Sequence, residues 1–275
     1  MSTLLAMCVF DTIENKRSAY TQHTLYSLLD SVDFNKHRLA IYDQKSCLET
    51  QRILDDFRLE FGAVYSEENL IIIHGTENVG TARGINFCWA ERREGENAGK
   101  LDNDFIVFQN GWVDMIEDCF SRAPEIGLIG LKRVDLEECV AHEHEWYKSE
   151  LYQIPHVKGQ RWRTVEIVKH VLGTCQIYSD KFLKDYGFML QQGLYGLDDS
   201  LAGIRAEALG YKSAFLCGVD IDHIDPGGTD YTQWKSDYAG DRMNEHGRVY
   251  HALKEKKLNP YYNGTDTWEQ WSQLS

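Results

Sequence analysis

Two aspartates separated by one residue, Asp102 and Asp104, are the first residues of this sequence that could do chemistry. In an extended turn, residues i and i+2 point to the same side, so both carboxylates can face one cation. Carboxylate oxygens suit Mg²⁺ and Mn²⁺, which keep further coordination positions for phosphate oxygens. Such a pair is also common in solvated turns, so its place in the fold has to decide between these interpretations.

A second acidic pair, Asp198 and Asp199, opens a segment of helical spacing that stops at Gly210. The helix dipole favours carboxylates at a helix N-terminus, so the pair could serve only as a cap. Alternatively, burial and the charge of its neighbour could raise the proton affinity of one aspartate and make it a general base. Both interpretations can hold together.

A histidine and a glycine pair follow the last apolar run of the main part of the chain. His223 lies soon after a strand predicted at 214–217, where its imidazole could complete a metal site with the DxD pair. A lone histidine is more often structural. Gly227 and Gly228 then indicate a turn or hinge of the kind that a movable lid uses.

The elements that must position these residues begin as a repeat of strand and helix. Apolar runs at 4–10, 38–42 and 70–73 predict strands, and each is followed by apolar residues at helical spacing. Three such units imply a parallel sheet with right-handed crossovers. Ligands of these sheets bind beyond the carboxyl ends of the strands, so Asp43 and Asn78 become candidates by position.

The pattern is less regular further along the chain. A weak strand is predicted to end at Leu101, directly before the DxD pair, and an alternative places that strand at 105–108. We expect loops over the sheet at 135–160. Residues 1–226 are predicted to form the α/β catalytic domain, and residues 227–275 a lid or tail packed on it. Further elements are expected at 112–120 (helix), 128–129 and 165–168 (strands), and 251–257 (helix).

The composition excludes several classes of protein. With 275 residues, 43% hydrophobic and 26% charged, the chain can bury a large core and is neither disordered nor collagen-like. The formal charge of −14 argues against general attraction to nucleic acid or anionic lipid. No run approaches the roughly 20 apolar residues of a membrane span, and the start lacks the features of a signal peptide. We therefore expect a cytoplasmic protein, in the host cytoplasm if it is phage-encoded.

Taken in order, these pieces resemble the family 2 glycosyltransferases, which are inverting enzymes of GT-A fold. The resemblance covers residues 4–226 and implies a Rossmann-like α/β fold with a mostly parallel central sheet flanked by helices. The motifs that carry it are Asp43 after the second strand, the stretch Asn78–Asn86, Asp102 and Asp104, the loop Gly173-Thr174-Cys175, and Asp198-Asp199 spaced before Arg205 and Gly210.

The resemblance implies a role for each matching position on the donor side. Asp43 would hydrogen-bond the nucleobase, usually uracil, while Asn78 and Arg83 would lie near the nucleotide and its phosphates. Asp102 would face the ribose and the metal, and Asp104 would be the more direct ligand of Mn²⁺ or Mg²⁺. His223 is similar to the late histidine that many GT-A enzymes add to the metal shell.

On the catalytic side, the resemblance assigns Asp199 as the base by its distance to Arg205. Asp198 stands where the family usually has a glutamate. The reaction that the resemblance implies is displacement of a nucleoside diphosphate, expected to be UDP, by an acceptor hydroxyl. A divalent cation stabilises the leaving charge and a carboxylate takes the proton, so the anomeric centre inverts in one step.

Two rival functions start from the same residues. A non-catalytic nucleotide-sugar-binding module could keep the fold, although retention of both acidic motifs counts against it. A nucleotidyltransferase would also bind a nucleotide with Mg²⁺, but it normally has a glycine-rich basic loop after the first strand. Here that loop, 11–17, contains no glycine.

The acceptor hypothesis rests on one segment that departs from the acidic average. Lys158, Arg161, Trp162 and Arg163 combine cations with an aromatic ring, as expected where phosphates are neutralised and a base stacks. Gly173 and Thr174 follow on the acceptor side of the resembled fold. The chain as a whole resembles phage family 2 enzymes that attach sugars, arabinose among them, to 5-hydroxymethylcytosine in DNA. The alternative is a glycosyltransferase of polysaccharide or lipopolysaccharide biosynthesis, and a solvated loop is the simplest explanation of the segment.

Overall fold

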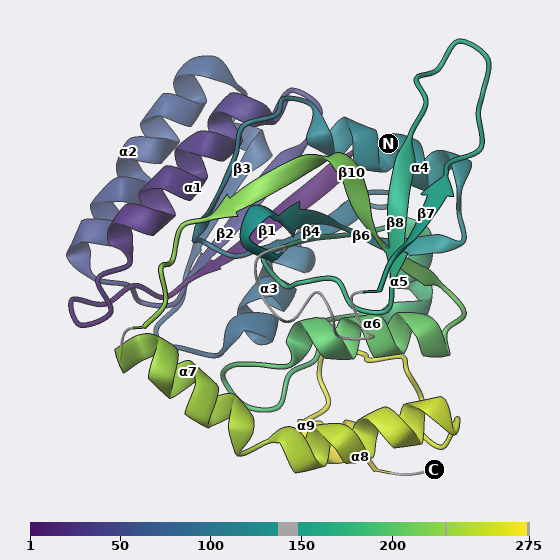
Figure 1. Ribbon diagram of the computed structural model, residues 1–275. Coiled ribbons are helices and arrows are strands. Elements are labelled where there is room, and N and C mark those ends of the chain that lie inside the picture. The colour runs from purple at the N-terminus through teal and green to yellow at the C-terminus, as the bar shows by residue number, and fades with distance from the viewer. Residues whose placement is uncertain (137–147, 229, 274–275) are drawn as a thin grey trace.

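The first strand is buried because it carries apolar residues on both faces. The structure is a computed structural model that describes residues 1–136, 148–228 and 230–273. In β1 (Thr3–Val9), Leu5 and Met7 face one hydrophobic core, whereas Leu4 and Ala6 face another. Strands of this kind need helices on both sides of the sheet, which Figure 1 shows.

Helices cover each face of the sheet according to their apolar stripes. The first core is closed by α1 (Ser18–Ser31), α2 (Leu48–Val64) and α4 (Trp112–Arg122). The second is closed by α3 (Thr81–Trp89), α5 (Asp180–Tyr186) and α6 (Asp198–Ala208).

Among the described residues the sheet has 10 strands, in the order β3-β2-β1-β4-β9-β6-β10-β8-β7, with β5 paired to β10. Five strands run parallel to β1, and their carboxyl ends therefore meet at one edge of the sheet: β2 (Arg38–Asp43), β3 (Leu70–His74), β4 (Asn97–Leu101), β6 (Ile126–Arg133) and β10 (Lys212–His223). The antiparallel strands are β5 (Phe105–Val107), β7 (Glu150–Gln153), β8 (Thr164–Val168) and β9 (Cys175–Tyr178). The described residues also form the 3-10 turns η1 (Glu67–Asn69) and η2 (Val134–Leu136).

The α/β class with a mostly parallel central sheet is confirmed, with differences in detail. The weak strand and its alternative both exist, as β4 before the DxD pair and β5 after it. The expectation of loops over the whole of 135–160 was wrong for β7, which pairs with β8 in an antiparallel hairpin. Residues 137–147 of that stretch lie outside the described part of the chain.

The C-terminal segment is more helical than its polar sequence indicates. The single helix expected at 251–257 is instead α8 (Met243–Lys254), and it is accompanied by α7 (Asp230–Gly240) and α9 (Trp268–Trp271). The few apolar residues of α8 and α9, Val249 and Leu253 among them, pack with Leu201 and Ile204 of α6 in a third core. Figure 1 shows α8 and α9 beside α6. No described helix is long and apolar enough to span a membrane.

Candidate functional site

A cavity of about 360 Å³ opens at the edge where the carboxyl ends of the parallel strands meet. It brings together both acidic pairs, the histidine after β10 and the loop before β9, as their positions at strand ends require. Its charged and loop residues are Lys100, Asp102, Asp104, Arg133, Gly173, Thr174, Asp198, Asp199, His223, Asp225 and Lys235.

Lys100 explains why the strand before the DxD pair is polar. Its buried ammonium lies 2.6 Å from Oδ1 of Asp102 and donates to the carbonyl of Gly173 at 2.5 Å. Burial lowers the pKa of Lys100, but the charges of Asp102 and Asp198 outweigh burial and raise the pKa overall. Lys100 therefore stays cationic and ties the DxD loop to the loop before β9.

Asp104 is held by a buried arginine that comes from the start of α1. Arg17 forms two contacts of 2.5 Å, from Nη2 to Oδ2 of Asp104 and from Nη1 to Oδ2 of Asp225. Nε2 of His223 is 3.5 Å from Oδ2 of Asp104. Burial raises the pKa of Asp104, but the hydrogen bond with His223 and the charge of Arg17 outweigh it, so the carboxyl stays ionised.

The middle residue of the DxD turn, Asn103, is fixed from the end of β1. Its amide donates to Oδ1 of Asp11 at 3.0 Å and to the hydroxyl of Thr21 at 2.7 Å. Asp11 is fully buried and also accepts from Thr21 and Thr50. These bonds set the direction in which Asp102 and Asp104 leave the loop.

The second acidic pair opens α6, as expected, but its two members have different surroundings. Oδ1 of Asp199 accepts from the backbone of Ser200 at 2.8 Å, and Oδ2 accepts from the backbone of Gly173 at 3.1 Å. Nε2 of His170 lies 3.5 Å from the same Oδ2. Asp198 receives one long bond of 3.3 Å from Gln191, and its Oδ2 is buried without a hydrogen-bond partner among the described residues.

These surroundings give the pair opposite proton affinities. Burial, followed by the charge of Asp199, raises the pKa of Asp198 to about 6, although Lys100 opposes the shift. For Asp199, burial also raises the pKa, but His170 and Lys100 outweigh burial and lower the pKa overall. Asp199 is thus an ionised carboxylate at the cavity wall, with 27% of its side chain exposed.

The predicted nucleobase residue, Asp43, ends β2 at the same edge of the sheet. Its carboxylate is buried and accepts from the backbone of Ser46 at 2.8 Å, while Nδ1 of His74 lies 3.2 Å away. Asn78 accepts from the backbone of Gly80 and so shapes the turn into α3. The structure does not bring Asp43 or Asn78 into the acidic cavity itself, whose described lining begins at Thr81.

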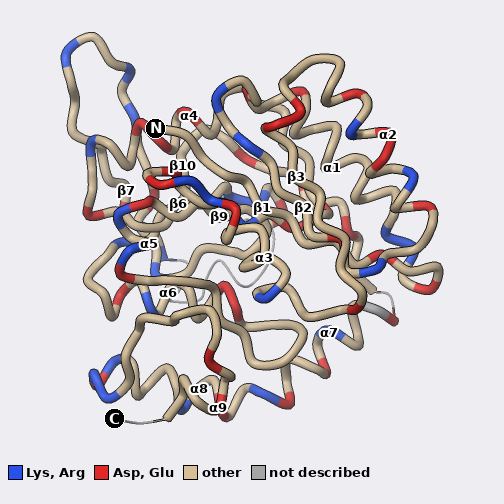
Figure 2. The backbone as a smooth tube through the Cα atoms, turned by 180° about the vertical axis from the view of Figure 1, so that it is seen from behind, with Lys and Arg blue, Asp and Glu red and all other residues tan. Residues whose placement is uncertain are grey.

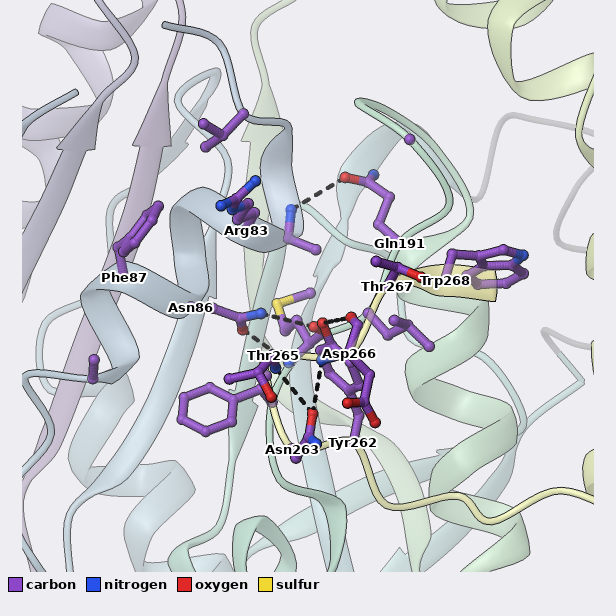
Figure 3. A pocket seen from close by; sticks show the side chains of 18 residues that line it. Arg83, Asn86, Phe87, Gln191, Tyr262, Asn263, Thr265, Asp266, Thr267 and Trp268 are labelled. Carbon is purple, nitrogen blue, oxygen red and sulfur yellow. Dashed lines mark hydrogen bonds between the residues drawn. The ribbon is translucent and has the colours of Figure 1, made fainter. Parts of the chain in front are cut away.

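Arg83, predicted to lie near the phosphates, lines a second and larger cavity. This cavity, about 690 Å³, lies between α3, the loop 188–193 and the segment 262–268, and Figure 3 shows Arg83 on its wall. Gln191 joins the two cavities: it accepts from the backbone of Ala82 at 3.2 Å and donates to Asp198 in the other.

The basic segment predicted to meet the acceptor lies elsewhere. Among the described residues that line the acidic cavity, Gly173 and Thr174 are present and none comes from 156–163. Figures 1 and 2 show the β7–β8 loop projecting from the end of the molecule opposite α7. Arg163 pairs with Asp118 of α4 at 3.3 Å, and Trp162 is 61% exposed and stacks on His156.

The residues predicted to form a hinge and a lid lie beside the acidic cavity. Gly227 and Gly228 adopt φ of +70° and +68°, which favours glycine at both positions. α7 follows, with Lys235 at the cavity, and the hydroxyl oxygen of Tyr238 accepts a hydrogen bond from the backbone N–H of Leu194 at 2.9 Å. The side chain of Tyr231 lies outside the described part of the structure.

One further group of metal-ligating side chains exists among the described residues. Ligand atoms of His37, Asp114 and Glu117 lie within 4.8 Å of one another, near the amino end of β1, where Thr3 bonds Glu117. The ammonium of Lys36 already contacts both carboxylates. This group is remote from the acidic cavity, and the Lys36 ammonium already supplies the positive charge beside its carboxylates.

Comparison with solved structures identifies the fold. The chain superimposes on a mannosyltransferase from Pyrobaculum calidifontis in complex with GDP-mannose and Mn²⁺, with a TM-score of 0.62 and 14% identity over 92% of this chain and 64% of that one. It is similar to S. aureus TarS in complex with UDP-GlcNAc, with a TM-score of 0.66, 14% identity, and 92% and 66% coverage. It also matches GalNAc-T7 with UDP, GalNAc and Mn²⁺, at a TM-score of 0.59 and 11% identity, over 92% and 50%.

The chain therefore has the GT-A fold of glycosyltransferases, and it spans about two thirds or less of the length of these structures. No family profile and no curated protein matches the sequence. Because the sequence identities are only 11% to 14%, the similarity to these structures establishes the fold alone.

Sequence reasoning missed Arg17, Lys100, Asp225 and His170 at the site. A signal existed for Lys100, because a lysine within a strand that must be buried needs an anionic partner. None existed for Arg17 and Asp225, which are separated by 208 positions in the sequence.

Proposed function

We propose that this protein is a divalent-cation-dependent glycosyltransferase that moves a sugar from a UDP-sugar to an acceptor hydroxyl with inversion. The observation that supports the proposal is the single cavity that joins the DxD pair, His223 and the Asp198–Asp199 pair. One acidic group can serve the leaving diphosphate while the other serves the attacking hydroxyl. Neighbouring folds bound to UDP-GlcNAc, UDP and GDP-mannose agree with a nucleotide-sugar donor.

The residues present fit a divalent cation. Oδ1 of Asp104 is buried without a hydrogen-bond partner in the described structure, and a buried carboxylate oxygen of this kind requires compensation. His223 adds an imidazole beside it, and Asp102, with its side chain 34% exposed, adds a second carboxylate. Oxygen and imidazole ligands suit Mn²⁺ and Mg²⁺. When bound, the cation would stabilise negative charge on the departing diphosphate.

The chain's own residues would accept the proton, orient the carboxylate that accepts it and exclude water. Asp199, ionised and partly exposed, accepts the proton of the acceptor hydroxyl as that oxygen attacks. Its bonds from Gly173 and Ser200 fix the carboxylate in one orientation. Lys235 of α7 adds positive charge at the cavity, and α7 excludes water from the sugar.

The acceptor is assigned only as a hydroxyl compound. The cations and the tryptophan that suggested hydroxymethylcytosine DNA lie on the β7–β8 loop, away from the cavity. A saccharide acceptor of polysaccharide or lipopolysaccharide biosynthesis needs no basic surface, which agrees with the charge of −14.

A panel of nucleotide sugars, read by thermal unfolding with and without Mn²⁺, tests the donor. A UDP-sugar should raise the melting temperature only when Mn²⁺ is present, because a ligand of the folded state stabilises it. The sugar that shifts the temperature is then offered with saccharides, hydroxymethylcytosine DNA and unmodified DNA. Binding with neither transfer nor hydrolysis would instead establish a nucleotide-sugar-binding module, and transfer only to the modified DNA would restore the DNA acceptor.

A further inference from the structure

The acidic cavity contains nearly as many cations as carboxylates. The negative charges of its aspartates are balanced by lysine and arginine side chains. Arg17 does not line the cavity itself but forms salt bridges with two of these aspartates. The carboxylates are Asp102, Asp104, Asp198, Asp199 and Asp225, and the cations are Lys100, Arg133, Lys235 and Arg17. A free divalent cation would therefore meet a cavity that is already close to neutral.

Among these cations, Arg17 contacts the predicted metal ligand Asp104 directly. It is 4% exposed, and its two nitrogens each contact a carboxylate at 2.5 Å, on Asp104 and Asp225. The geometry leaves Oδ1 of Asp104 for a cation while Oδ2 stays with the guanidinium. A cation on Oδ1 would lie beside a fixed positive charge in a site of low dielectric constant, which is unfavourable.

A bound nucleoside diphosphate makes the electrostatic interactions at the cation site favourable. Its phosphate charges attract both the cation and the nearby cations of the protein, so each ligand lowers the cost of binding the other. We propose that Arg17 is the built-in counter-ion of the cation site, which makes the divalent cation and the nucleoside diphosphate bind as a pair. The inference rests on the proposed function, since it deepens the role of the same cavity.

Mn²⁺ binding, measured by the paramagnetic resonance signal of free Mn²⁺ with and without UDP, tests the proposal without any turnover. In the wild-type protein, saturating UDP should tighten Mn²⁺ binding at least tenfold. Arg17→Gln keeps a hydrogen-bond donor and removes the charge. It should bind Mn²⁺ at least fivefold more tightly than wild type without UDP, and the enhancement by UDP should shrink.

Matched variants separate charge from structure. Arg17→Lys keeps the charge and should stay within twofold of wild type, and Arg248→Gln changes an exposed arginine paired with Glu245 and should do the same. Asp225→Asn removes a negative charge and should weaken Mn²⁺ binding without UDP, opposite in sign to Arg17→Gln. Circular dichroism confirms that each variant is folded, and if Arg17→Gln does not fold, the Asp225→Asn and Arg17→Lys pair decides.

Two results would overturn the proposal in distinguishable ways. Equal or weaker Mn²⁺ binding by folded Arg17→Gln without UDP, or unchanged binding by Asp225→Asn when that pair has to decide, would show that Arg17 serves only the fold. Absence of Mn²⁺ binding by the wild-type protein even with UDP would remove the cation from the proposed function as well.

Discussion

Two adjacent aspartates show how surroundings, and not residue type, divide chemical roles. Asp198 and Asp199 begin the same helix, yet only Asp199 is bonded by two backbone amides and approached by an imidazole. Asp198 lies deeper, against Lys100 at 3.8 Å, with one oxygen that has no hydrogen-bond partner among the described residues. The ionised, oriented member is suited to accept a proton from an acceptor hydroxyl.

Replacement of Asp199 by asparagine should therefore lower transfer roughly 10²- to 10⁴-fold, the usual contribution of a general base. The amide keeps the shape of the side chain but cannot take the proton, so donor affinity should stay within a few-fold of wild type. Initial rates and UDP titrations measure the two quantities separately. Wild-type turnover in this variant would move the role to Asp198.

Because the pKa of Asp198 is raised in the folded state, the free energy of unfolding should depend on pH through this residue. A carboxyl whose pKa is about 6 in the folded state and near 3.8 in the unfolded state stabilises the fold below pH 4, and that stability is lost as the pH rises through 6. Asp198→Asn removes the buried charge, so at pH 8 the free energy of unfolding should rise by about 1 to 3 kcal/mol. Urea denaturation at pH 8 and at pH 5 measures the gain, which should be smaller at pH 5. An equal gain at both values would argue against the titration.

How much of the site could be predicted from the sequence depends on how far apart in the sequence the interacting residues lie. Strand ends and the acidic motifs are local patterns, so Asp102, Asp104, Asp199 and His223 could be placed at one edge of a parallel sheet. Ion pairs between distant segments leave no local pattern, and Arg17 belongs to that class. The basic segment 158–163, which was predicted to meet the acceptor, is not among the described lining of the cavity, because proximity in sequence to Gly173 does not imply proximity in space.

At the scale of elements, α6 is anchored in its last turn by a buried arginine. The guanidinium of Arg205 donates to the carbonyls of Pro260, Phe188 and Tyr186 and lies 3.6 Å from the centre of the Tyr186 ring. It thereby joins α6 to the end of α5, to the loop that follows α5 and to the C-terminal segment. The sequence showed only the spacing of this arginine from the acidic pair.

Arg205→Met should fill most of the space but leave three buried carbonyls without this donor. We expect a loss of about 3 kcal/mol in unfolding free energy, because hydrogen bonds to charged groups are worth more than neutral ones. Guanidinium denaturation measures the loss. The exposed change Arg248→Met is the comparison, and an equally small effect of both would show that the anchor contributes little.

The hinge glycines and α7 predict a ligand-dependent closure. UDP with Mn²⁺ should hold α7 over the cavity through Lys235, so cleavage by a nonspecific protease at Gly227 and Gly228 should slow several-fold. Tyr238→Phe removes the bond to Leu194 and should increase cleavage of the unliganded protein. Equal rates with and without both ligands would contradict closure.

At the scale of the whole molecule, the β7–β8 loop projects from the end opposite α7, and none of residues 156–163 is among the described residues that line the acidic cavity. Triple replacement of Lys158, Arg161 and Arg163 by alanine should therefore leave donor hydrolysis within twofold of wild type. If DNA is the acceptor, the same variant should weaken DNA binding and flatten its salt dependence. Filter binding at several salt concentrations, set beside hydrolysis rates, separates the two effects.

The strand order also decides when, during synthesis, the site can form. β4, which leads into the DxD turn, lies between β1 and a strand made more than 70 residues later, β9, and β10 closes against β5 through His223 and Phe105. Such long-range pairings make folding slow. A ribosome-bound chain that ends before residue 223 therefore holds both DxD carboxylates but lacks His223, which lies beside Asp104, and Asp225, which pairs with Arg17. Nascent chains of increasing length should gain affinity for the nucleotide in one late step, not gradually.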